Sequence, residues 1–422
     1  MSLGLLSSVS DNTHRVPIFY DSLPATKPEA AKASKASVST LPSGLIVVTE
    51  DACTTSTVTM TYPKAGSGSE MLGEEGAALV NKCLAFNSGS GLSTILINRT
   101  IENEGATPHA TADRFGASLG YTVEPENAIG LVPLLALDCT FEKWDVRDAA
   151  KLAEFQIAEA NKSAEIVLTE QIFAAAYGAS SPMGRPFFCS APGPYEIASF
   201  RSRGYGINGA VLAATGVKDH AAFCTEVDAL MAEAPKGDGT PAATVASGYL
   251  GGEARLSAPS TGFAHVALAF DSKSASPMRN VIKQCFSLIG KDAGVSAFAS
   301  GTMVGVYAGA PSESAGALDA AITETLLAKI TPDIVSKAIA MAKADATFAL
   351  DCGSQGLAEA MTASVLETGS FSDAATVAKS YDSLSEKDVT AAVGAMLKTT
   401  PSLAAVGDID VVPYQGTFAS RF

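Results

Sequence analysis

The chain has 422 residues, of which 29 are basic and 44 are acidic, so its formal net charge is −15 at pH 7. Phosphate backbones are bound through basic patches, and this acidic balance therefore excludes nucleic acid from the partners that we expect. The sequence contains no run of about 18 apolar residues, which excludes a membrane-spanning helix of its own and leaves membrane association through partner subunits as the expectation.

Residues 1–36 are predicted to form an extended arm. The segment is rich in Ser, Ala and Lys, carries Pro17, Pro24 and Pro28, and shows no sustained helical periodicity. A mitochondrial transit peptide is rich in arginine and poor in acidic residues, whereas only Arg15 occurs here. We therefore expect no targeting signal within this arm, which leaves open that a presequence was removed before residue 1.

Residues 37–234 alternate short strands with helices, and we interpret them as a first domain. Strands are indicated by β-branched or alternating apolar residues, and helices by apolar residues that recur every three or four positions. The predicted strands lie at 44–50, 57–62, 116–123 and 201–217, and the predicted helices at 73–86 and 141–177.

Residues 235–247 contain a run rich in Pro and Gly and are predicted to be a linker to a second domain at 248–422. Strands are predicted at 265–270, 303–307 and 402–409, and helices at 278–289 and 318–330. Thr331-Pro332 predicts another helix start, and Ser385 with Asp388 resembles a capping box. Because this order repeats that of 37–234, we predict an α+β fold of two related, duplicated domains.

The stretch GAALVNKCLAF at 76–86 is the most informative motif. Together with KAGSGSE at 64–70, it looks like the frame around the inverted zinc motif H-x-x-E-H of pitrilysin-type (M16) metallopeptidases. In that frame the two histidines fall on Leu79 and Cys83, and the glutamate falls on Lys82. The motif is therefore present as a frame without its functional side chains.

These three substitutions predict that the chain is not a peptidase. Two histidines one helical turn apart hold Zn²⁺, while the glutamate takes a proton from the metal-bound water. Leu79 has no lone pair to give a metal, Lys82 is a cation at neutral pH, and Cys83 alone does not make a metal site. We therefore expect no catalytic, metal-binding or cofactor-binding residue.

The span from about residue 41 to the C-terminus resembles the M16-type family that includes the mitochondrial processing peptidase subunits and the core proteins of the cytochrome bc1 complex, with core protein 2 as the nearest likeness. The resemblance depends on the order and spacing of short segments, none of which is specific alone. They are LPSGL at 41–45, KAGS at 64–67, IENEG at 101–105, YTVE at 121–124, AAAY at 174–177 followed by Cys189, GGE at 251–253 with His265, VSAF at 295–298 and AAVG at 404–407.

The resemblance implies two α/β sandwich domains, each a largely antiparallel sheet packed with helices. It also implies a structural subunit of complex III that lies on the matrix side of the mitochondrial inner membrane. Its partners would be a core protein 1-like subunit, cytochrome b, cytochrome c1 and other subunits of a dimeric complex. The haems and the iron–sulfur cluster would belong to those partners.

Two other functions stay open. The first is the non-catalytic, presequence-binding partner subunit of the processing peptidase, which in this family uses a glycine-rich loop; the matching region at 289–295 is short and has two glycines. The second is an active zinc peptidase with displaced ligands. The family's third zinc ligand is a glutamate further along the chain, and the resemblance places it at Glu159 within QIAE at 156–159.

The remaining candidate residues have simpler interpretations. We expect Lys82 to be solvated or paired at an interface, and Cys83 to be a packed thiol, because no histidine lies near it in the sequence to lower its pKa. His265 is expected to be a core or interface residue, and His109 a surface or loop residue. Seven scattered cysteines without a C-x-x-C pair predict reduced thiols.

The charged fraction of 17% is low against an average of about 25%. One explanation is enrichment of alanine in helices. The other is a surface largely covered by partner subunits, because the cores of interfaces are depleted in charged residues. The sequence leaves both explanations open.

Overall fold

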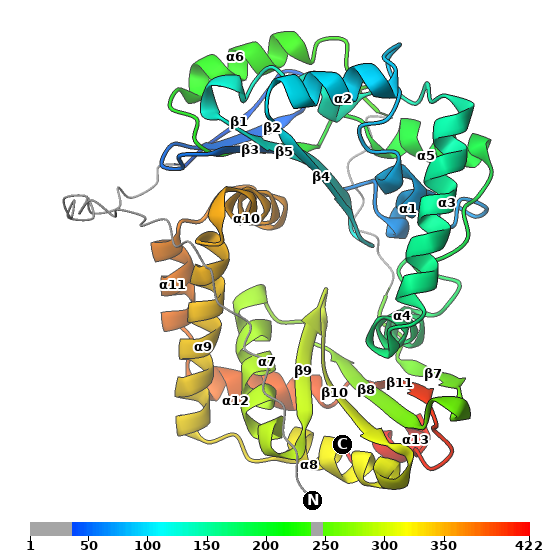
Figure 1. Ribbon diagram of the computed structural model, residues 1–422. Helices are drawn as coiled ribbons and strands as arrows, with labels where there is room; N and C mark the ends of the chain where they lie inside the picture. Colours follow the sequence, from blue (N-terminus) through cyan, green and yellow to red (C-terminus); the bar gives the residue numbers. More distant parts are fainter. Residues whose placement is uncertain (1–35, 238–247) are drawn as a thin grey trace, which may run out of the picture. The chain divides into compact units, whose positions relative to one another are not determined.

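The computed structural model describes residues 36–237 and 248–422, which contain two β-sheets packed with helices (Figure 1). The first sheet has six strands in the order β1-β2-β6-β3-β5-β4, and its pairs are antiparallel except that β2 and β6 are parallel. Its strands are β1 (Ala36–Thr40), β2 (Ile46–Glu50), β3 (Ser56–Tyr62), β4 (Thr107–Ala112), β5 (Ala117–Val123) and β6 (Val211–Ala214).

The second sheet has five strands in the order β7-β11-β8-β10-β9, and it is antiparallel except for the parallel pair β11 and β7. Its strands are β7 (Gly252–Ser257), β8 (Phe263–Asp271), β9 (Val295–Ser300), β10 (Met303–Pro311) and β11 (Ser402–Gly407). The two related, largely antiparallel sheets confirm the predicted α+β class.

Helices occupy most of the chain between the strands. The first half contains α1 (Ala77–Cys83), α2 (Thr94–Asn103), α3 (Lys143–Ala160), α4 (Ala164–Tyr177), α5 (Pro194–Gly204) and α6 (His220–Leu230). The second half contains α7 (Ser276–Gly290), α8 (Leu318–Leu327), α9 (Pro332–Leu350), α10 (Gly353–Thr368), α11 (Ala374–Asp382), α12 (Glu386–Met396) and α13 (Gln415–Ala419). Within the described ranges, no helix has the combination of length and apolar character that crossing a bilayer requires.

Local signals set several helix ends as predicted. Thr331 accepts a hydrogen bond from the Ile334 amide at the start of α9, and Ser385 forms a reciprocal capping box with Asp388 at the start of α12. Each cap satisfies backbone N–H groups that have no partner within the helix. The two predicted helix starts are therefore confirmed.

Three predicted elements in the first half are wrong. The helix predicted at 141–177 is two helices, because the Ser163 side chain accepts from the Ile166 amide and caps a new helix after a short turn. Of the strand predicted at 201–217, residues 201–204 belong to α5, and only Val211–Ala214 lie in the sheet. His109 lies in the edge strand β4 rather than in a loop, because its segment pairs with β5.

Each sheet is covered in part by a helix from the other half of the chain. Helix α4 packs on β7, β8 and β11 of the second sheet, and α10 packs on β3 and β6 of the first (Figure 1). A hydrogen bond of 2.8 Å joins Thr57 Oγ1 of β3 to Ser354 Oγ of α10. Because each half supplies part of the other's core, we expect neither half to be stable alone.

The predicted boundaries of the domains at 37–234 and 248–422 remain a prediction, although the two sheets fall within them. Of the predicted arm at 1–36, only Ala36 belongs to the described residues, and it is the first residue of β1. Of the predicted linker at 235–247, residues 238–247 lie outside the described residues. The Pro235 carbonyl accepts a hydrogen bond of 2.9 Å from the Ile207 amide, which ties the end of the first half to the turn before β6.

Candidate functional site

The degenerate motif lies on α1, which packs against α3 and α5. Gly76 precedes the helix with a φ of 88°, and a Cβ there would approach the Ser190 carbonyl oxygen to 2.6 Å. This left-handed conformation and close approach favour glycine. Gly76 therefore fixes how the chain enters the helix that carries the three motif positions.

Leu79, at the first histidine position, is part of the hydrophobic core. Its exposed fraction is 0%, and it packs in a cluster with residues of the first sheet such as Val58 and Met60. A leucine held in an apolar core cannot ligate a metal, and an imidazole there would lack the hydrogen-bond partner that a buried polar group needs. The position therefore serves packing.

Lys82 and Cys83 meet a glutamine of α3. The Lys82 ammonium Nζ donates to Gln156 Oε1 at 3.3 Å, and Gln156 Nε2 donates to Cys83 Sγ at 3.7 Å. Burial raises the pKa of the Cys83 thiol, and the charge of Lys82 offsets only part of this effect. The thiol is therefore protonated at neutral pH, and the reactive form that metal binding or nucleophilic attack requires is disfavoured.

Glu159 does not meet this group. It is exposed and forms an ion pair with Lys162 on the solvent side, about one turn beyond Gln156 along α3. The residue that lies against Cys83 is thus Gln156, whereas Glu159, where the resemblance places the family's third zinc ligand, points to solvent. In the part of the chain that the structure describes, no group of three or more His, Cys, Asp or Glu side chains gathers to hold a metal ion.

A buried carboxylate organises the loop before α1. Glu70 accepts hydrogen bonds from the Gly76 and Ala78 amides at 3.3 and 2.8 Å, so it occupies the N-terminal end of the helix, where a negative charge is favoured. Burial nevertheless raises the pKa of Glu70 to about 7, against the opposing effect of these two amides. Burial therefore favours the protonated form of this carboxyl group.

The next carboxylates in this loop are paired with arginines. Glu74 is buried and forms an ion pair of 2.5 Å with Arg203 of α5, and Glu75 lies 3.5 Å from Arg185. Glu74 is therefore an interior carboxylate rather than a solvated one. Its role is to fasten the loop to α5, which also packs on α1.

One buried group near α1 was missed by sequence reasoning. The Arg201 guanidinium lies 4.2 Å from the ring centroid of Tyr205 and donates to the Leu137 carbonyl oxygen, while its Nε and Nη1 atoms have no hydrogen-bond partner among the described residues. In the sequence, Arg201 belongs to a segment that we interpreted as a strand, and no other feature indicated that its side chain is buried. The described contacts of Arg201 are structural and include no carboxylate ion pair.

His265 behaves as expected. It lies in β8, and its Nδ1 is 2.9 Å from the Tyr307 hydroxyl in β10. Burial lowers the pKa of this imidazole, so it is neutral at neutral pH. All seven cysteines are free thiols, in agreement with the prediction that they form no disulfide framework.

Comparison with known proteins finds a peptidase-like family model that is similar to part of the first half. Residues 46–190 match the family model described as Insulinase (Peptidase family M16). The mitochondrial-processing peptidase subunit alpha of Solanum tuberosum is 27% identical over 256 residues, which are 58% of this chain and 49% of that protein. A probable alpha-2 subunit of the same peptidase from Arabidopsis thaliana is 27% identical, and the alignment covers 61% of this chain and 52% of that protein.

The chain thus spans about half the length of the curated relatives that it matches. Among solved structures, a chain of complex III2 from Candida albicans, bound to Inz-5, aligns with a TM-score of 0.77 and 17% identity, covering 91% of this chain and 99% of that one. At this identity the likeness shows a shared fold. The predicted resemblance to the M16-type family is confirmed.

Proposed function

We propose that the protein is a non-catalytic structural subunit of mitochondrial ubiquinol:cytochrome c reductase, equivalent to core protein 2. The observation that carries this proposal is the state of the motif on α1: Leu79 is packed in the core, and Gln156 bridges Lys82 and Cys83. Without two imidazoles and a carboxylate, this site cannot make the metal-bound hydroxide that an M16 peptidase uses.

The fold likeness supports the choice of complex. It extends over 99% of a chain from a complex III2 structure, so both halves of the two folds correspond. The low charged fraction of 17% also suits a subunit whose surface is covered in an assembly. In this proposal the chain lies on the matrix side of the inner membrane and contacts a core protein 1-like subunit, cytochrome b and cytochrome c1.

The chain's own contribution is shape and surface for assembly, while the haems and the iron–sulfur cluster reside in its partners. Solubilising the native membranes gently and separating the complexes by size tests this directly. The chain is expected to migrate with polypeptides that show the absorption of b- and c-type haems. Recovery of the native chain as a free, haem-free monomer would refute the proposal.

A second candidate is the presequence-binding partner of a processing peptidase. It is favoured by the alpha subunits of that peptidase among the relatives. Against it, the region of the family's glycine-rich loop is a short connection from α7 to β9, made of the 3-10 turn Lys291–Ala293 and Gly294. Mixing the chain with a zinc-bearing partner subunit and a presequence peptide separates the two proposals, because only this candidate predicts cleavage that depends on the chain.

A further inference from the structure

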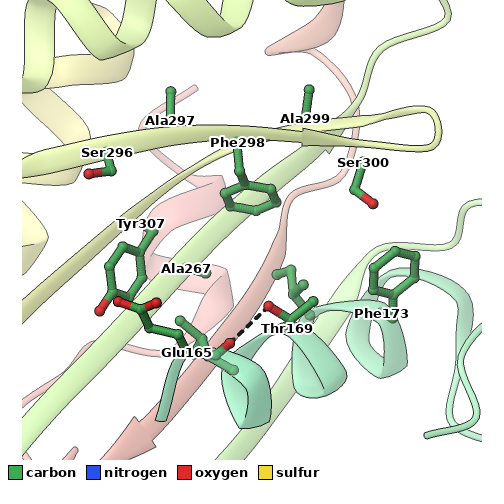
Figure 2. Close-up of a pocket in the computed structure, with 12 residues that line it drawn as sticks. Glu165, Thr169, Phe173, Ala267, Ser296, Ala297, Phe298, Ala299, Ser300 and Tyr307 are labelled. Carbon is green, nitrogen blue, oxygen red and sulfur yellow. Dashed lines mark hydrogen bonds between the residues drawn. The ribbon is translucent and has the colours of Figure 1, made fainter. Parts of the chain in front are cut away.

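A cavity of about 430 Å³ lies between α4 and the second sheet, apart from the degenerate motif. Leu168, Ile172 and Phe173 of α4 line one side, and Phe298 of β9 and Tyr307 of β10 line the other. Figure 2 shows the Phe298 ring pointing from β9 toward the helix, while Ala297 and Ala299 point away from it. The size and the mainly apolar walls are those of a small-molecule site.

The mouth of this cavity carries a carboxylate. Glu165, in the first turn of α4, is the one charged side chain among the described residues that line the cavity. Its carboxylate lies beside the Tyr307 ring in Figure 2. Within the described ranges, no lysine or arginine forms an ion pair with it.

The neighbouring polar groups do not neutralise Glu165. The Tyr307 hydroxyl is engaged with His265 Nδ1 at 2.9 Å, and the two rings are stacked with an interplanar angle of 8°. Because His265 is neutral at neutral pH, the mouth keeps its negative charge. The net charge of −15 adds to the potential that attracts a cation to this mouth.

We propose that this cavity binds an elongated organic cation, with an aromatic or aliphatic body between Phe298 and α4 and a primary ammonium group at Glu165. The aromatic rings of Phe173, Phe298 and Tyr307 favour an apolar body and tolerate a nearby cation. The Glu165 carboxylate makes the site prefer positively charged ligands over negatively charged ones. This inference depends on the cavity alone and stands or falls independently of the proposed function.

The test compares 4-phenylbutylamine with 4-phenylbutyrate, which have the same apolar body and opposite charges. Ligands of this size bind with a Kd on the order of a millimolar, so binding to the full chain is measured by ligand-observed NMR titration. The amine is expected to bind about tenfold more tightly than the acid, because an exposed carboxylate attracts one and repels the other. In Glu165→Gln this ratio is expected to fall to about twofold.

Matched variants separate the local charge from the field of the whole protein. Glu154→Gln removes the same charge from an exposed position on α3 outside the cavity, and it is expected to leave the tenfold ratio unchanged. Thr169→Phe fills the mouth from an exposed position of α4 and is expected to abolish binding of both probes; Ser296→Tyr does the same from β9 if the first variant does not fold.

Three results would overturn the proposal. The first is equal binding of the amine and the acid by the unmodified chain. The second is loss of the preference in Glu154→Gln to the same extent as in Glu165→Gln. The third is the absence of detectable binding of 4-phenylbutylamine to the unmodified chain.

Discussion

The replacement Leu79→His places a zinc-type ligand at its family position and is expected to destabilise the protein strongly. Leu79 has an exposed fraction of 0% and lies in the core of the first half. Burying a leucine side chain contributes about 1.5–3 kcal/mol, and an imidazole buried without hydrogen-bond partners costs about 1–3 kcal/mol more. We therefore expect the free energy of unfolding to fall by about 2.5–6 kcal/mol.

Urea unfolding of the full chain, followed by far-UV circular dichroism, measures this loss. The control is Lys82→Gln on the same helix, which keeps the hydrogen-bonding capacity toward Gln156 and is expected to change the free energy of unfolding by less than about 1 kcal/mol. A loss below about 1 kcal/mol for Leu79→His would refute the reasoning, because it would mean that residue 79 does not face the core.

Further predictions follow from the same contacts. Gln156→Leu replaces the amide that donates to Cys83 Sγ with an apolar side chain, so we expect Cys83 to react more slowly with a thiol reagent, as measured by the rate of Ellman's reaction in a variant whose other cysteines are replaced. The pKa of Glu70 is raised on folding to about 7, so its contribution to stability is present below its ordinary pKa and is lost as the pH rises through 7. The unfolding midpoint of the unmodified chain should therefore fall more between pH 5 and pH 8 than the midpoint of Glu70→Gln does. Met361→Ala on α10 should lower the free energy of unfolding by about 2–5 kcal/mol in a denaturant titration, because Met361 is fully buried against strands of the first sheet.

The sequence predicted those features of the fold that depend on short-range signals. The caps at Thr331 and Ser385 lie within a few residues of the amides that they satisfy, and both were predictable. The break between α3 and α4 also has a local signal in Ser163, but the continuous apolar spacing on either side obscured it. Apolar periodicity shows that a face is buried without showing which surface buries it.

The exchange of α4 and α10 between the two sheets lay beyond sequence reasoning for that same reason. Helix α10 packs on β3 and β6, which lie far from it in the sequence. No residue pattern within the α10 segment indicates which strands it packs against. Likewise, the assignment of His109 to a loop failed because its strand forms only by pairing with β5.

The residues at the motif positions could be identified from the sequence, whereas their contacts could not. Leu79, Lys82 and Cys83 were identified from the motif frame, and their positions on one short helix agree with it. Gln156 was named only as the start of the segment that contains Glu159, because the side of α3 that meets α1 depends on how the two helices pack. The approach of Gln156 to Cys83 is therefore a property of the tertiary structure.

The most direct test of the central claim measures the zinc content of the purified full chain together with its cleavage of a basic presequence peptide. The chain is first dialysed against zinc and then against buffer. The account predicts far less than one equivalent of zinc and no cleavage above that of a chelator-treated sample. One equivalent of tightly bound zinc together with chelator-sensitive cleavage would contradict the account, because it would show that α1 still carries a working metal centre.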